Sequence, residues 1–422
     1  MPSTNKPGRM SVNWTSLALI MTGQLILGQA SAVEWQLAGK GEIAITEHDN
    51  VSRQTANWFE RGTGQLGYPQ STVALGPQYL SIQADTDSDF SARLNAQWHR
   101  QPEAGTRITE GWLNWAPLPV QGYRMRARIG AFYPQLSLEN TDTAWTSPYS
   151  STFSALNSWI AEEVRTKGAE FSISRPGRFF QSEHSWTLVG SLFQGNDPAG
   201  TILAWRGFAL HNLQTGLGER VNFARYPSLQ QEPLTLQSAW VEPTREVDNR
   251  TGFYVGGHWQ YRQHTQIRAY YYDNNGDPLA FRNEQYAWHT RFSSVAVQHI
   301  VNDNWQLVAQ WLDGSTLMGP AVVDNNFSAW FVLANWQSNG VSATLRFDKF
   351  AVNDNDNTII DNNNGNGRAL LLAVGYQLTE QLNLSAEHIR LSSTQHNRAQ
   401  QWPWPAKQHQ QLSKLLLTWH WK

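Results

Sequence analysis

The sequence predicts an all-β fold: a transmembrane antiparallel β-barrel of about 16 strands, with an inserted segment that constricts its pore. Three observations predict it. Runs of roughly 9–12 residues alternate apolar and polar side chains, which suits tilted strands that cross a bilayer. Short turns and longer polar stretches alternate between these runs. The chain has 21 Trp, 13 Tyr and 17 Phe but a mean hydropathy of -0.50, as an amphipathic wall requires.

The alternation is clearest in residues 90–99, where Phe90 and Leu94 fall on one face and Arg93 and Asn95 on the other. This period of two is the signature of a strand with one apolar and one polar face. The expected strands are 35–46, 78–85, 89–99, 107–116, 122–131, 167–175, 184–194, 251–262, 265–273, 285–300, 304–313, 327–337, 340–350, 367–378, 381–392 and 410–421.

Two long insertions interrupt the strands. Residues 132–166 follow the fifth expected strand and form the candidate constriction loop, with a short helix expected within 152–165. Residues 195–250 follow the seventh strand and are expected to form a long outer loop. If 202–212 and 235–242 are strands instead, the barrel has 18 strands, and both termini still lie on one side.

The N-terminus has the features of a secretory signal peptide. Two basic residues precede an apolar stretch at 14–28, and Ala30 and Ala32 follow in an A-x-A pattern. We therefore expect a signal peptide over 1–32, export across the inner membrane, and a mature barrel over 33–422. A membrane anchor is the alternative, but the stretch is shorter than the roughly 20 residues of a spanning helix.

Charge and cysteine content exclude several classes of protein. Removing residues 1–32 removes two of the 32 basic residues and no acid, so 30 basic residues face 34 acidic ones and the formal charge is -4. This balance does not fit a nucleic-acid partner. The chain has no cysteine, which excludes disulfides and thiolate metal sites.

Three arginines, Arg124, Arg126 and Arg128, alternate with apolar residues just before the candidate constriction loop. A lipid-facing arginine at the bilayer midplane costs about 2–4 kcal/mol. The three side chains are therefore expected to face the lumen, where they repel cations and attract anions. Pro134 marks the end of the strand and the start of the inserted segment.

Ten charged residues are candidates for lining the pore. They are Arg93, Arg107, Glu110, Arg124, Arg126, Arg128, Glu139, Asp142, Glu162 and Glu163. In one interpretation the arginines and an acidic inserted loop set a transverse field that selects the solute. In the other, the arginines are structural and pair with the loop residues Glu139, Asp142, Glu162 and Glu163.

No enzyme, metal or cofactor site is predicted. The adjacent carboxylates Glu162 and Glu163 point in different directions, and no base–nucleophile set lies near them in a motif. The twelve histidines lack metal-ligand spacing. The polar stretch 353–367 lacks the residue order of an EF-hand, so a solvated outer loop is the favoured interpretation.

These features together resemble Gram-negative outer-membrane porins, over the whole chain at the level of architecture. Residues 132–166 are placed like the third loop of trimeric porins, and 130–139 are similar to the strand-to-loop region of phosphate-selective porins. The chain departs from the pattern by ending on Lys422 rather than on the aromatic Trp421. The resemblance implies a passive channel for small hydrophilic solutes or ions, surrounded by outer-membrane lipid and assembled as a homotrimer.

Two other functions are compatible with a β-rich exported chain. One is an outer-membrane barrel enzyme of the lipase or protease type, whose residues would be assembled across strands. The other is a secreted β-protein that binds carbohydrate through its tryptophans. Strand length and the alternation of loops favour the channel over the soluble protein.

Overall fold

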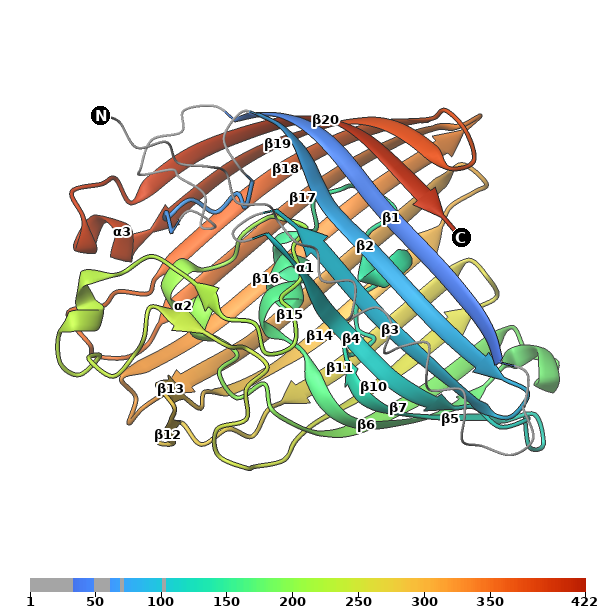
Figure 1. The fold of residues 1–422 in the computed structure, drawn as a ribbon, viewed down its shortest axis with the longest axis horizontal. Coiled ribbons are helices and arrows are strands. Elements are labelled where there is room, and N and C mark those ends of the chain that lie inside the picture. The colour runs from blue at the N-terminus through green and yellow to red at the C-terminus, as the bar shows by residue number, and fades with distance from the viewer. Residues whose placement is uncertain (1–32, 49–60, 69–71, 101–103) are drawn as a thin grey trace, which may run out of the picture.

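The computed structural model describes residues 33–48, 61–68, 72–100 and 104–422, so the expected signal peptide at 1–32 lies outside the described residues. Within them, 16 strands close into one antiparallel barrel (Figure 1). These strands are β1 (Val33–His48), β2 (Thr72–Thr86), β3 (Phe90–His99), β4 (Gly105–Trp115), β5 (Arg124–Phe132), β6 (Thr166–Arg175), β7 (His184–Gln194), β10 (Gly252–Tyr261), β11 (Thr265–Asp273), β14 (His289–Ile300), β15 (Trp305–Met318), β16 (Val323–Ser338), β17 (Val341–Asp354), β18 (Gly365–Gln377), β19 (Leu382–Gln395) and β20 (Lys407–Trp421). The predicted fold class and the count of 16 are confirmed.

Short elements lie between the barrel strands. They are the helices α1 (Ala155–Glu163), α2 (Thr201–Arg206) and α3 (His396–Gln401), the 3-10 turns at Thr143–Trp145, Gly177–Phe180 and Pro227–Gln230, and the strands β8 (Val221–Asn222), β9 (Trp240–Val241), β12 (Phe281–Arg282) and β13 (Gln285–Tyr286). The alternative of 18 barrel strands is wrong, because 202–212 begins in α2 and 235–242 contributes only β9 to a two-stranded sheet. No helix in the described part of the chain is long and apolar enough to cross a membrane.

The barrel has two unlike ends. The turn end carries short connections such as 262–264, 301–304 and 339–340, whereas the loop end carries the long segments 195–251 and 274–288. In Figure 1 the loop end lies to the left with α2 and α3, and the C-terminus lies at the turn end to the right. β1 pairs with β20 and closes the barrel.

Side chains alternate between the two faces of the wall. On β17 the apolar Leu345 and Phe347 are exposed on the outer face, while the charged Arg346 and Asp348 are completely buried on the inner face. β18 repeats this alternation along almost its whole length. The outer face is apolar because it meets lipid, and the inner face therefore carries the charged groups.

The wall is lower on one side than on the other, and we call β3 to β7, β10 and β11 the low wall and β14 to β20 the high wall. Strands β3 to β7, β10 and β11 have 9–11 residues, while β14 to β20 have 12–16. β5 is paired to β4 over only five residue pairs. Gly130 of β5 has a φ of 143°, and a Cβ there would clash with the carbonyl oxygen of Gly111. Only glycine fits this close approach, just before the chain leaves the wall.

The inserted segment 133–165 folds into the lumen. All nine residues of α1 are buried, and Ser154 caps the helix by accepting a hydrogen bond from the backbone N–H of Asn157 at 3.1 Å. The indole of Trp159 packs against Phe292 of β14 and Phe327 of β16, with ring centroids 5.5 and 5.1 Å apart. The helix expected within 152–165 is present, and it packs against the inner face of the high wall.

Candidate functional site

The three alternating arginines of β5 lie on the inner face of the barrel. Ile129 is 60% exposed on the outer face, whereas the neighbouring Arg128 is 5% exposed. Arg124 and Arg126 share the face of Arg128 because side chains two residues apart on a strand point the same way. The expected register of this strand is therefore confirmed.

Two adjoining cavities lie in front of these arginines, and we call them together the arginine recess. The first has a volume of about 440 Å³ and lies between the wall and the inserted segment. The second has a volume of about 410 Å³, and Arg126 and Gln135 line both. The charged lining residues are Arg93, Glu110, Arg124, Arg126, Arg128, Asp142, Glu170 and Arg268.

Among the described residues, the lining comprises five arginines and three carboxylates, a formal charge of +2. Arg128 is neutralised by a bidentate pair with Glu170 of β6, at 2.7 and 2.8 Å. The other four arginines, Arg93, Arg124, Arg126 and Arg268, have no carboxylate within 4.0 Å in the described part of the chain. Their charges are therefore available to the lumen.

These four guanidinium groups are held by neutral partners. Arg93 donates to the amide oxygen of Gln83 and Arg126 to that of Asn114. Arg124 lies over the ring of Phe179, 5.6 Å from its centroid. A neutral acceptor or an aromatic face fixes the orientation of an arginine without cancelling its charge.

Arg268 of β11 belongs to the recess although it was not among the residues expected from the sequence. It donates to the carbonyl oxygens of Gln135 and Ser137, at 3.1 and 2.8 Å, and so joins the inserted segment to the low wall. The signal was present in the alternation of Ile267, Arg268 and Ala269, which puts Arg268 on the inner face.

The proposed pairing of the arginine ladder with acids of the inserted segment is wrong. Glu139 pairs with Arg346 of β17 at 2.8 Å, and Asp142 pairs with Lys40 of β1 at 3.0 Å. In the barrel order β17 lies opposite β5, and β1 is separated from β5 by β2, β3 and β4. The segment leaves the wall at β5 and crosses the lumen, so its acids meet the bases of other walls.

Glu162 and Glu163 also bind elsewhere. Glu162 pairs with Arg206 of α2 at 2.6 Å and lies 3.0 Å from Nε2 of His211. Burial raises the pKa of Glu162, but the attraction of Arg206 and His211 outweighs it and lowers the pKa to about 2. Glu163 accepts hydrogen bonds from the backbone N–H groups of Ile202 and Leu203 at 2.8 and 3.0 Å. Both carboxylates tie α1 to α2.

The two remaining candidates lie on β4. Glu110 lines the recess, where it accepts hydrogen bonds from Asn95 at 2.7 Å and from the backbone N–H of Tyr133 at 2.9 Å. Arg107 lies nearer the loop end, pairs with Glu219 and lines neither cavity of the recess. The structure thus brings Arg93, Glu110, Asp142 and the β5 arginines together and leaves Arg107 outside.

The lumen also contains an apolar core that was not predicted from the sequence. We call it the lumen core: the ring of Trp159, the inward-facing Phe292 and Phe327, and Phe208, among other buried residues. These side chains fill the lumen around α1. The signal was present in the inner face of β14 to β18, where large apolar residues occupy positions that a water-filled pore would leave polar.

A closed antiparallel barrel with a segment folded into a charged lumen is the architecture of outer-membrane porins, and solved structures of outer-membrane proteins, a porin among them, share the fold. The in-vitro folded trimer form of OmpT, an outer membrane protein of Vibrio cholerae, matches with a TM-score of 0.54 at 8% identity, over 92% of this chain and 100% of the other. The anion-selective porin from Comamonas acidovorans matches with a TM-score of 0.52 at 10% identity, over the same shares. No family model and no curated protein matches the sequence. The predicted resemblance to porins is confirmed for the fold.

Proposed function

We propose that the protein is an outer-membrane channel for the passive diffusion of small hydrophilic solutes, and that the arginine recess makes it prefer anions. The observation that carries this proposal is the formal charge of +2 in the recess, with four arginines lacking a carboxylate partner in the described part of the chain. Fixed positive charges in the lumen lower the energy of a passing anion and raise the energy of a passing cation.

The distribution of acids supports the preference for anions. Of the acids in the inserted segment, only Asp142 reaches the recess, and Lys40 pairs with it. The others bind arginines or backbone N–H groups outside the recess. The field in the recess is therefore set by the wall arginines rather than by a balance of wall arginines and loop acids.

Conduction through this conformation is expected to be small. The lumen core packs α1 against the inner face of the high wall, and the segment 195–250 adds Leu203, Phe208 and Leu210 to the same core. Solutes must therefore pass between the inserted segment and the low wall, where the arginine recess lies. This restriction brings every passing ion close to the arginines.

We propose that the chain is not an enzyme. Glu162 and Glu163, the adjacent carboxylates considered for acid–base chemistry, are almost completely buried and are fully engaged with α2. A general acid or base must reach its substrate within hydrogen-bond distance. The lipase or protease alternative would need a different site.

The proposed assembly is a homotrimer in the outer membrane. A strand of 9 residues such as β5 rises about 21 Å when tilted by 45°, less than the apolar band of about 25 Å. A second copy against the low wall would relieve this mismatch. The Vibrio cholerae protein OmpT, which shares the fold, also has a trimer form. Chemical cross-linking of the native protein tests this assembly.

Channel function is tested with purified, folded protein in planar bilayers. We expect single-channel currents and, in a salt gradient, a reversal potential of the sign that marks anion preference. A folded protein that neither conducts nor releases small solutes from liposomes would refute the channel. Cation preference would refute the role of the recess while leaving the channel intact.

A further inference from the structure

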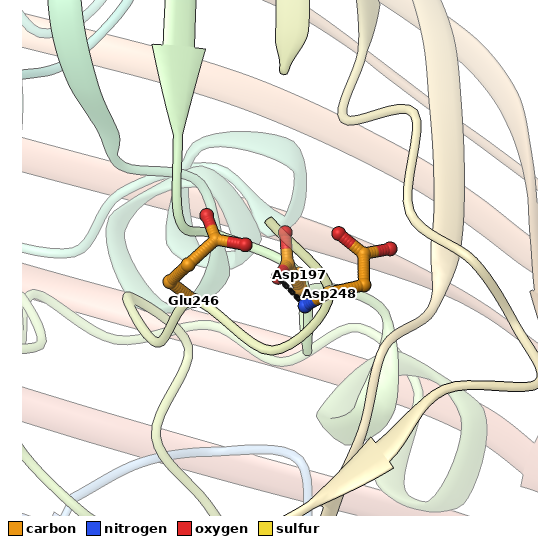
Figure 2. A group of neighbouring side chains, drawn as sticks. All are labelled: Asp197, Glu246 and Asp248. Carbon is orange, nitrogen blue, oxygen red and sulfur yellow. Dashed lines mark hydrogen bonds between the residues drawn. The ribbon is translucent and has the colours of Figure 1, made fainter. Parts of the chain in front are cut away.

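Three carboxylates converge at the loop end, far from the recess. Asp197 follows β7, and Glu246 and Asp248 precede β10, so the group joins the beginning and the end of the segment 195–250. We call these three residues the loop clasp. Figure 2 shows Asp197 between Glu246 and Asp248, with the three carboxylates close together. One oxygen from each lies within 4.8 Å of the others.

Asp197 is the buried member of the loop clasp. Its side chain is 1% exposed, and its Oδ1 atom is buried without a hydrogen-bond donor in the described part of the chain. Its Oδ2 atom accepts hydrogen bonds from the backbone N–H groups of Val247 and Asp248. A buried carboxylate oxygen without a donor costs free energy unless a cation or a proton satisfies it.

The backbone holds the other two carboxylates in place. Glu246 accepts from the N–H groups of Gly195 and Asn249, both at 2.5 Å. Asp248 accepts from the N–H groups of Arg250, at 2.8 Å, and Asp277. The chain thus fixes three negative groups in one small volume.

No basic side chain in the described part of the chain neutralises the loop clasp. Among the described residues, no lysine, arginine or histidine nitrogen lies within 4.0 Å of Asp197, Glu246 or Asp248. The nearby Arg250 pairs with Asp277 at 2.9 Å instead. Burial, then the neighbouring carboxylates, raise the pKa of Asp197 to about 7. The three carboxylates therefore repel one another, and no ion pair with a basic side chain of the described residues offsets this repulsion.

We propose that the loop clasp binds a calcium ion, with the buried Oδ1 of Asp197 and one oxygen each from Glu246 and Asp248 as ligands. Ca²⁺ takes oxygen ligands at about 2.3–2.6 Å, so two ligands of one ion can lie up to about 5 Å apart. The spacing of up to 4.8 Å fits this limit. Mg²⁺ demands a near-octahedral shell and usually keeps several waters, so a site built from three protein carboxylates suits Ca²⁺ better.

The ion would close the segment 195–250 at its base. Asp197 and Glu246 are far apart in the sequence, and a bond between them removes the freedom of the whole intervening loop. The loop in turn carries α2, whose Arg206 pairs with Glu162 of α1. Calcium at the loop clasp would therefore stabilise the packing of α2 against α1. This inference does not depend on conduction.

The test is a calcium titration of the full-length barrel, folded in detergent without lipopolysaccharide, by isothermal titration calorimetry. We expect saturable binding of about one Ca²⁺ per chain, at least roughly tenfold weaker in Asp197→Asn. Glu246→Gln is the second variant, in case Asp197→Asn does not fold, and should weaken binding likewise. Glu232→Gln removes an exposed acid from the same loop and should leave binding unchanged.

Two results would overturn the proposal. One is the absence of saturable calcium binding to the wild type, which is what three carboxylates that share only a proton would give. The other is equal binding by the wild type, Asp197→Asn and Glu246→Gln in preparations whose heat-modifiable gel mobility shows a folded barrel. Equally tight binding of Mg²⁺ would reject the assignment to calcium.

Discussion

Removing the three unpaired arginines of strands β3 and β5 should reverse the charge selectivity. The triple variant Arg93→Gln, Arg124→Gln and Arg126→Gln changes the formal charge of the recess from +2 to -1. Glutamine keeps the approximate length and the hydrogen-bonding capacity of each side chain. The wild type should prefer anions and the triple variant should prefer cations.

The magnitude follows from Coulomb's law. A monovalent ion that passes roughly 8 Å from one charge in water interacts with it by about 0.5 kcal/mol. Screening at 0.1 M salt, with a Debye length of about 10 Å, reduces this to about 0.25 kcal/mol. Removing one arginine raises the energy barrier for a passing anion by this amount and lowers the barrier for a passing cation by the same amount. The difference between the two barriers therefore changes by about 0.5 kcal/mol per arginine. Three arginines change the permeability ratio by about tenfold.

The assay is the reversal potential of single channels in a salt gradient, measured for the wild type, each single variant and the triple variant. Arg291→Gln is the matched control, because Arg291 is exposed on the outer face of β14. It removes the same charge without changing the lumen. An unchanged reversal potential in the triple variant, with unaltered conductance, would show that ions do not pass the recess.

Three further predictions concern the inserted segment. Arg346→Gln leaves the buried carboxylates of Glu139 and Asp348 without their ion-pair partner. It should therefore lower the free energy of unfolding, measured in urea, by about 3–5 kcal/mol. Lys349 is exposed on the same strand, so Lys349→Gln should change this free energy by less than about 0.5 kcal/mol. Trp159→Ala should lower the free energy of unfolding by about 3–5 kcal/mol and raise single-channel conductance, because it removes the largest side chain of the lumen core. Trp311→Ala, on the lipid face of β15, should leave conductance unchanged. Glu162 has a folded pKa of about 2, below its ordinary value of 4.5, so about 3 kcal/mol of stability should disappear as the pH falls from 4.5 through 2. Glu162→Gln should lose this part of the pH dependence of thermal unfolding.

Each of these predictions has a result that contradicts it. Equal unfolding free energies for Arg346→Gln and Lys349→Gln would show that the buried ion pairs do not anchor the segment. Unchanged conductance in Trp159→Ala would show that the lumen core does not narrow the path. Identical pH profiles for the wild type and Glu162→Gln would place the acid sensitivity elsewhere.

The strands could be predicted because each has one face in lipid, which imposes a strict period of two. The prediction failed where the pattern weakens near strand ends. The expected strands 304–313 and 327–337 leave 314–326 outside the wall, but β15 extends to Met318 and β16 begins at Val323. A short run of polar residues resembles a loop in the sequence. Such residues nevertheless form a strand when their backbone pairs with a neighbouring strand.

The partners of the inserted segment could not be predicted from one sequence. Glu139 and Arg346 are 207 residues apart in the chain, and nothing in their local sequences marks them as a pair. The β5 arginines could be placed on the inner face by alternation alone. The lumen core was missed because a polar interior was assumed, although the inward positions of Phe292 and Phe327 carried the opposite information.

The seam between β1 and β20 has a consequence for how the protein assembles. Gly39 pairs with Trp421, so the final ladder joins the two ends of the barrel sequence and forms only after every other strand exists. Until then β14 and β16 expose apolar side chains on both faces. The outer face contacts lipid in the finished barrel, and the inner face, with Phe292 and Phe327, packs against α1. A chain in this state exposes apolar side chains on both faces of part of its wall, so we expect it to aggregate readily in water before the barrel closes and the lumen fills.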